Sequence, residues 1–221
     1  GQPVWLMTVP VLRRLEKYGS ILFQGDSITD AFRRPEERNE AFQLGNGFVF
    51  LIGSRLRMEH PGWPGTLLNR GISGNGVADL AGRWQADALD LRPDVISLLV
   101  GINDTLDEVK GVGQSADAFA EAYRALLALT REALPDVALI LCEPFALCVG
   151  EVTPLVRERL APRQAAVQQL ASAFGACWVP LQGAFDTAAG SHPAYWCYDG
   201  IHPTAAGCAL IAREWTRCVE G

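Results

Sequence analysis

The sequence predicts an α/β protein, in which a three-layer α/β/α sandwich contains a five-stranded, mostly parallel sheet. Short apolar runs alternate along the chain with longer stretches of helical pattern, and this alternation is typical of strands joined by right-handed crossovers. The apolar runs are nearly continuous, as expected for parallel strands that are covered on both faces. With 221 residues, of which 49% are apolar and 20% are charged, the chain fits a single domain over residues 1–221.

Five runs rich in β-branched residues or leucine are the expected strands, at residues 21–24, 66–70, 95–100, 137–142 and 177–180. Longer stretches with apolar residues at helical spacing are the expected helices, at residues 48–59, 77–91, 116–134, 155–174 and 205–218. Thr153 and Pro154 mark the start of the fourth helix, because threonine is a good N-cap and proline suits the first helical position. Neither a repeat nor a linker divides the chain.

Charge and composition narrow the range of partners and compartments. The net charge of −6 and the pI near 5.1 argue against nucleic acid and membrane as partners. No run approaches the roughly 18 apolar residues of a membrane span. The chain starts without a secretory-signal pattern, and its six cysteines form no C-x-x-C pair, as expected of free thiols in a reducing compartment. We therefore expect a cytoplasmic protein, although a signal peptide removed before Gly1 would leave the same sequence.

Three residues near the two ends of the chain have the types required for nucleophilic catalysis. Ser27 follows the first apolar run, and Asp199 and His202 lie three residues apart near the C-terminus. A serine hydroxyl becomes a good nucleophile when a neighbouring base removes its proton, and the base works best when a third group orients it. The chain has only three histidines, so few candidates exist for that base.

The predicted topology brings these residues to one edge of the sheet. Ligands of open parallel sheets bind outside the carboxyl ends of the strands. Ser27 follows the first strand there, residues 71–75 follow the second, residues 101–104 follow the third, and Asp199 and His202 come after the fifth. Taken singly, each has a local explanation: Ser27 as an N-cap, Asn103 in an Asx-turn, and Asp199 in a turn before the last helix. Their joint occurrence favours a catalytic site.

Four segments in this order resemble the four sequence blocks of the SGNH hydrolases, also called GDSL esterases. They are Gly25-Asp26-Ser27-Ile28, Asn69-Arg70-Gly71-Ile72-Ser73-Gly74, Gly101-Ile102-Asn103-Asp104 and Asp199-Gly200-Ile201-His202-Pro203. Isoleucine stands at position 28, where the family has leucine. The resemblance spans residues 25–203 and implies the flavodoxin-like fold of that family, which agrees with the alternating pattern.

The resemblance also implies a role for each matching residue. Ser27 would be the nucleophile, His202 the general base and then acid, and Asp199 the group that orients the imidazole. The oxyanion hole would consist of the backbone N–H groups of Ser27 and Gly74 and the side-chain amide of Asn103. We expect Gly74 to allow close approach of the substrate, and Ser27 to benefit from the dipole of the following helix. Asp26, Thr29, Asp30 and Asp104 are expected to hold the loops together.

Within the family, several segments are similar to the bacterial acetylxylan-esterase and carbohydrate-acetylesterase branch. They are Gln24-Gly25-Asp26-Ser27-Ile28-Thr29-Asp30, Ala81-Gly82-Arg83-Trp84 and the stretch from Asp199 to Gly207. This similarity implies a serine esterase that acts on a small-molecule ester, an acetylated sugar, through an acyl-enzyme. Tyr195, Trp196 and Tyr198 precede the Asp199 segment and are candidates for substrate binding, although core or subunit contacts are an equal alternative. Assembly into a homo-oligomer stays open.

Other functions remain as alternatives. A short-chain lipid ester, a thioester or a lysophospholipid would use the same triad, and a non-catalytic carbohydrate-binding protein could use the same fold. The glycine-rich segment at residues 71–76 has the spacing G-x-x-G-x-G, which argues against a dinucleotide site. The histidines form no H-x-x-x-H pair, so the sequence indicates neither a metal nor another cofactor.

Overall fold

The computed structural model describes residues 10–221, whose centre is a parallel sheet of five strands. The strands are β1 (Ser20–Gly25), β2 (Thr66–Asn69), β3 (Val95–Leu99), β4 (Ala138–Cys142) and β5 (Cys177–Val179). Their order in the sheet is β2-β1-β3-β4-β5, and every neighbouring pair is parallel. Each predicted strand is present within two residues at either end, and the predicted α/β/α fold class is confirmed.

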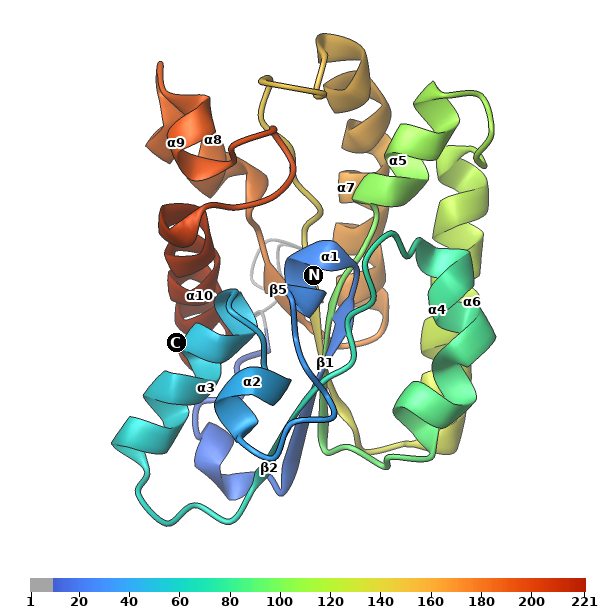
Figure 1. Ribbon diagram of the computed structural model, residues 1–221. Coiled ribbons are helices and arrows are strands. Elements are labelled where there is room, and N and C mark those ends of the chain that lie inside the picture. The colour runs from blue at the N-terminus through green and yellow to red at the C-terminus, as the bar shows by residue number, and fades with distance from the viewer. Residues whose placement is uncertain (1–9) are drawn as a thin grey trace, which may run out of the picture.

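Helices cover both faces of this sheet (Figure 1). The strand side chains alternate between the faces, so that Ile21 and Phe23 belong to one apolar core and Leu22 to the other. The first core includes side chains of α3 (Phe48–Glu59), α8 (Gln182–Ala189) and α10 (Ala205–Glu220). The second includes side chains of α4 (Val77–Trp84) and α6 (Ala116–Ala133), and α7 (Pro154–Ala173) contributes to both. This double cover explains why the strand sequences are continuously apolar.

Several elements differ from the prediction. The stretch predicted as one helix over residues 77–91 divides into α4 and a π-helical turn at Gln85–Leu89. The sequence analysis did not predict five helices of four or eight residues: α1 (Ser27–Asp30), α2 (Glu40–Gln43), α5 (Ile102–Val109), α8 and α9 (Pro193–Trp196). Elements of one or two turns carry too few periodic positions to be recognised from sequence. No helix within residues 10–221 is long and apolar enough to cross a membrane.

The strand order places a switch point at the carboxyl ends of β1 and β3. From β1 the chain moves to β2 on one side and then returns to β3 on the other side, so the two connections diverge and leave a crevice. Ser27 follows β1 and Asn103 follows β3, which brings both residues to this crevice. The fold therefore selects the position at which the predicted catalytic loops meet.

Helix α10, which follows the Asp199–His202 segment, is attached to the middle of the sheet through Trp215. The indole is fully buried, its Nε1 donates a hydrogen bond to Ser97 Oγ of β3 at 3.0 Å, and it packs against the ring of Phe23. The contact joins the C-terminal helix to the two central strands.

We expect Trp215→Phe to lower the free energy of unfolding by about 2–4 kcal/mol, because it removes buried volume and the donor to Ser97. Urea denaturation followed by circular dichroism measures this loss. Leu129→Ala, at a half-exposed position on α6, is the matched control and should change the free energy by less than about 0.5 kcal/mol. Equal effects of the two variants would contradict the anchoring role of Trp215.

Candidate active site

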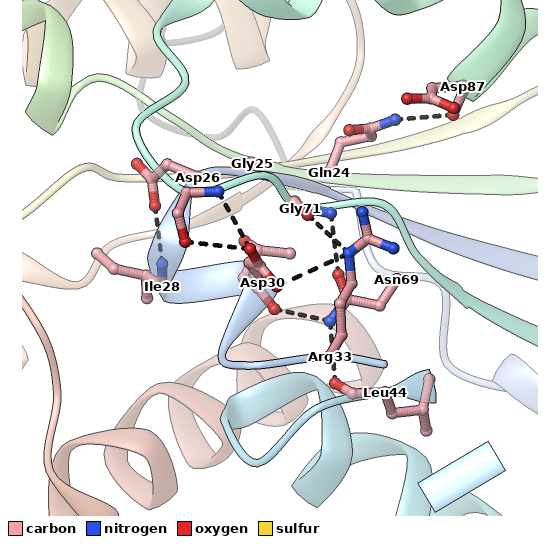
Figure 2. A network of polar contacts seen from close by, with 12 residues as sticks. Gln24, Gly25, Asp26, Ile28, Asp30, Arg33, Leu44, Asn69, Gly71 and Asp87 are labelled. Carbon is pink, nitrogen blue, oxygen red and sulfur yellow. Dashed lines mark hydrogen bonds and ion pairs between the residues drawn. The ribbon is translucent and has the colours of Figure 1, made fainter. Parts of the chain in front are cut away.

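Ser27 occupies the first position of α1, directly after β1. The turn before it is tight, because a Cβ at Gly25 would collide with the carbonyl oxygen of Leu99 and the hydroxyl of Thr29. Asp26 is the N-cap, and its Oδ1 accepts the N–H of Ile28 at 3.0 Å (Figure 2). Since α1 has only four residues, its dipole gives Ser27 less support than the sequence analysis expected.

The hydroxyl of Ser27 meets a histidine that lies 175 residues later in the chain. Its Oγ lies 2.9 Å from Nε2 of His202, and Nδ1 of the same ring lies 2.6 Å from Oδ2 of Asp199. When Nδ1 carries its proton towards the carboxylate, Nε2 is free to accept the serine proton. The structure thus brings together the three residues predicted as a triad, at hydrogen-bonding distances.

Asp199 is fixed by a tight loop of its own. Its Oδ1 accepts the backbone N–H groups of Ile201 at 2.9 Å and His202 at 2.7 Å. Partial burial acts to raise the pKa of Asp199, but the hydrogen bonds from the His202 side chain and from the two N–H groups outweigh it and lower that pKa. Asp199 therefore stays ionised opposite the imidazole, as an orienting group requires.

The predicted oxyanion donors lie around the same pocket. Ser27, Gly74 and Asn103 all line it. Gly74 has a left-handed backbone, with φ of +85°, and nothing lies within 4 Å of a Cβ built there. Glycine is favoured at position 74 by the left-handed backbone, and not because a side chain there would collide with neighbouring atoms. The Nδ2 of Asn103 donates to the carbonyl oxygen of Asn75 at 3.0 Å, which ties the loops after β2 and β3 together.

Acidic side chains hold these loops, as the sequence analysis expected. Oδ2 of Asp30 accepts both the N–H of Ser73 at 3.1 Å and its hydroxyl at 3.0 Å. The carboxylate of Asp104 accepts the N–H of Val77, at 3.1 Å for the nearer oxygen. Thr29 does not share this task, because its buried Oγ1 has no hydrogen-bond partner among residues 10–221.

A pocket of about 440 Å³ opens at the triad. Residues of six separate segments form its wall: Ser27, Ile28, Asp30, Ala31, Phe32, Asn46, Ser73, Gly74, Asn103, Tyr198, His202, Pro203 and Cys208. Tyr198 is 62% exposed, and its ring stacks against the His202 ring with centroids 6.0 Å apart. Residues 10–221 contain no group of three or more acidic, cysteine or histidine side chains arranged to hold a metal ion.

Two of the three aromatic residues proposed for substrate binding lie elsewhere. Trp196 packs against the apolar core, and Tyr195 is 65% exposed and meets the Trp196 ring edge-on, outside the pocket wall. Both belong to the single-turn helix α9, whereas Tyr198 comes after that helix ends. The structure therefore brings only Tyr198 to the pocket.

Comparison with known proteins agrees with this geometry. Residues 23–210 match the model of the GDSL-like Lipase/Acylhydrolase family. The chain belongs to this family. It is 33% identical to an acetylxylan esterase from Geobacillus stearothermophilus over 204 residues, which are 89% of this chain and 92% of that protein. The chain is therefore a carboxylic ester hydrolase, as the sequence resemblance implied.

Solved structures show the same similarity. A protein described as a GDSL-like lipase from Parabacteroides merdae ATCC 43184 superposes with a TM-score of 0.87 at 34% identity, covering 96% of this chain and 98% of that one. The acetylxylan esterase Axe2 from Geobacillus stearothermophilus gives a TM-score of 0.80 at 32% identity, covering 90% and 93%. Nearly the whole length of each protein takes part in the match.

Asn69 and Arg33 support the site although the sequence analysis assigned neither of them a role. The amide of Asn69 donates to the carbonyl oxygens of Thr29 at 2.7 Å and Leu44 at 2.9 Å, and its Oδ1 accepts the N–H of Gly71 at 3.0 Å. Arg33 Nε donates to the carbonyl oxygen of Gly71 at 2.7 Å (Figure 2). These bonds attach α1 to the glycine-rich loop that contains Gly74. A polar residue at the end of an apolar strand was the available sequence signal for Asn69.

Arg83 connects the end of β1, just before Ser27, with the loop that contains Gly74 and Asn75. Its guanidinium donates to Oδ1 of Asn75 at 2.8 Å and to Oε1 of Gln24 at 3.0 Å, and it pairs with Asp87 at 3.1 Å. Gln24 in turn donates to the carbonyl oxygen of Asp87 at 2.7 Å (Figure 2). The π-helical turn contains Asp87, so this irregular stretch supplies a partner to the arginine. Arg83 is a positioning residue for Asn75 and, through the Asn75 carbonyl, for Asn103.

We expect Arg83→Met to lower kcat by about 10- to 1000-fold with a much smaller change in KM, because an oxyanion donor then loses its support. Arg70→Met is the matched control, since Arg70 also pairs with Asp87, at 3.4 Å, but does not hold Asn75. Steady-state kinetics on one acetate ester compares the two. A parallel loss in both variants, or unfolding of the first by circular dichroism, would argue against a specific positioning role.

Burial raises the pKa of Asp26 from 3.8 to about 7, against the lowering effect of the N–H of Ile28 and the charge of His202. The folded protein therefore holds one proton more than the unfolded chain between about pH 4 and pH 7. The free energy of unfolding contributed by this group falls as pH rises through that range.

Asp26→Asn should remove this loss, because an amide keeps the acceptor for Ile28 and carries no charge. The variant should gain roughly 1–4 kcal/mol over the wild type at pH 8 and little at pH 4. Urea denaturation across that range measures the difference, with the exposed Asp136→Asn as control. A gain that is largest at pH 4 would contradict the assignment.

Proposed function

We propose that the protein hydrolyses acetyl esters of carbohydrates, with Ser27, His202 and Asp199 as a catalytic triad. The observation that carries this proposal is the continuous chain of hydrogen bonds from Ser27 through His202 to Asp199, at 2.9 and 2.6 Å, in the wall of an open pocket. The acetyl group and the sugar are supported by the two Geobacillus stearothermophilus comparisons, which concern an acetylxylan esterase.

The first half of the reaction forms an acyl-enzyme. Oγ of Ser27 attacks the ester carbonyl carbon while Nε2 of His202 accepts the hydroxyl proton, and ionised Asp199 stabilises the resulting imidazolium. Negative charge develops on the carbonyl oxygen, where the N–H groups of Ser27 and Gly74 and the amide of Asn103 donate to it. The intermediate collapses as His202 protonates the leaving alcohol oxygen, which releases the deacetylated sugar.

The second half releases the acid. A water molecule takes the place of the alcohol, His202 removes its proton, and the hydroxide attacks the acyl carbonyl carbon. The same donors stabilise the second tetrahedral intermediate, whose collapse returns the proton from His202 to Ser27. Acetate leaves, and the enzyme regains its starting state.

Ser27→Ala should lower kcat by about 10⁴- to 10⁶-fold, and His202→Ala should lose a similar factor, because members of a triad act as a unit. The double variant should lose little more than either single one. Hydrolysis of an aryl acetate by purified protein measures these factors, and Ser54→Ala, at a serine on α3 that bonds to its own helix, is the control. Near-wild-type turnover by Ser27→Ala would refute the triad.

The acyl preference distinguishes the acetylesterase from a lipid-ester hydrolase. We expect kcat/KM for aryl esters to fall steeply from acetate to butyrate and to be negligible for octanoate, in line with the acetylxylan esterases that the chain resembles. An acetylated xylopyranoside should be deacetylated by the wild type. Preference for octanoate would replace this proposal with the lipid-ester alternative, whereas aryl acetate turnover without sugar ester turnover would exclude only the carbohydrate.

A further inference from the structure

Phe32 combines extreme exposure with a place in the wall of the active-site pocket. Its side chain is 87% exposed, the highest value among the exposed large hydrophobic residues of the described chain, and it lines the same pocket as Ser27 and His202. An apolar ring left in water at a reaction site gains free energy when a ligand covers it. The ring is therefore available to a substrate.

The backbone that presents this ring is in an unfavourable conformation. Ala31 and Phe32 have φ angles of +44° and +59°, and within residues 10–221 only two other non-glycine residues have a positive φ. The left-handed region is costly for a residue with a Cβ, and two consecutive residues rarely adopt it. Such strain persists where the surrounding structure fixes it, and it concentrates at functional sites.

Hydrogen bonds on both sides of Phe32 hold the turn in place. The carbonyl oxygen of Ala31 accepts the N–H of Asn46 at 2.9 Å, and the carbonyl oxygen of Asp30 accepts the N–H of Arg33 at 2.9 Å. A Cβ at Gly45 would lie only 2.6 Å from that same Ala31 oxygen, so residues 45–46 pack closely against the turn. The turn is rigid although the ring itself is almost uncovered. A packing role for the ring is thereby excluded.

We propose that Phe32 is the platform on which the ring of the alcohol part of the ester lies during catalysis. The pocket, at about 440 Å³, is much larger than an acetyl group requires and suits a ligand of the size of a sugar ring. In the reaction the acetyl carbon bonds to Ser27, which lines the same pocket as Phe32, and the volume left over can hold the alcohol part. The alcohol part extends outward from Ser27 and covers that ring.

The chemistry of this wall fits a pyranose. One face of a pyranose presents C–H groups, which match the apolar face of the phenyl ring, and its hydroxyl groups project from the edge. Asn46 lines the same pocket and offers amide donors and an acceptor to such hydroxyl groups. The identification of the ring as a sugar rests on the proposed function, whereas the contact between Phe32 and the alcohol part does not.

Three acetate esters test the platform: an acetylated methyl xylopyranoside, phenyl acetate and ethyl acetate. Phe32→Ala should lower kcat/KM for the two ring-bearing esters by roughly 10-fold or more, mainly through KM, and for ethyl acetate by less than about twofold. Phe32→Trp should restore the ring-bearing substrates. Phe42→Ala, at a half-exposed aromatic residue on α2 outside the pocket wall, should change none of the three. The thermal midpoint of Phe32→Ala should match that of the wild type, because the ring is not packed.

Several outcomes would overturn the inference. Equal losses on all three esters would mean that Phe32 supports the catalytic turn. A larger loss on phenyl butyrate, measured in addition, than on phenyl acetate would place the ring beside the acyl group. Unchanged kinetics would remove any role in substrate binding. If the wild type rejects the xylopyranoside, the carbohydrate proposal fails, and the comparison of phenyl acetate with ethyl acetate still decides whether Phe32 contacts the alcohol part.

Discussion

The site depends first on the parallel pairing of β1 with its two neighbours, because this pairing sets where each loop leaves the sheet. Phe23 is opposite Asn69 on β2, and Gly25 is opposite Leu99 on β3. A slip of one residue would turn Asn69 to the other face and separate its amide from α1. The apolar side chains on both faces make such a slip costly, so the hydrophobic effect fixes the geometry of polar groups at the edge.

Polar side chains then convert this common edge into a site with fixed distances. Gln24, Asp26 and Asn69 are nearly completely buried. Gln24 and Asn69 have hydrogen-bond partners on other segments of the chain, whereas Asp26 caps its own turn at Ile28. Buried polar groups are costly when unpaired, so only the arrangement that satisfies all of them together is stable. The raised pKa of Asp26 shows that the cost is not fully offset at neutral pH. This enzyme thus holds a destabilising carboxyl group directly beside its proposed nucleophile.

The sequence predicts the fold and the candidate triad for a physical reason. Strands and long helices have periodic apolar patterns, and Ser27, Asp199 and His202 lie in short local motifs whose residue types are chemically restrictive. In the structure, the side chains of Ser27 and Asp199 each lie at hydrogen-bonding distance from the imidazole of His202. The fold class and the core of the site could therefore be predicted before any coordinates.

The remaining features arise from tertiary contacts that no local pattern encodes. Tyr195 and Trp196 lie only three or four residues before Asp199 in sequence, but they belong to helix α9 and are not part of the pocket wall. Phe32 stands in an unremarkable polar stretch, and its exposure follows from a left-handed turn held by residues 45–46. Arg83 donates hydrogen bonds to Gln24 and Gly25, which lie 59 and 58 positions earlier in the chain. Such features become visible only when the loops are placed in space.

The site combines polar groups that are held by hydrogen bonds with aromatic rings that are mostly exposed. Asp199, Asn103 and the backbone of Ser73 are each held by at least one hydrogen bond to another residue of the site. Phe32 and Tyr198 have rings that are mostly exposed, and Tyr198 shares only a stacking contact with His202. Changes at the held groups alter reactivity and stability together, whereas changes at the exposed rings alter mainly the surface that a substrate meets. On the proposed role of Phe32, replacing these rings would change the alcohols that the same framework accepts.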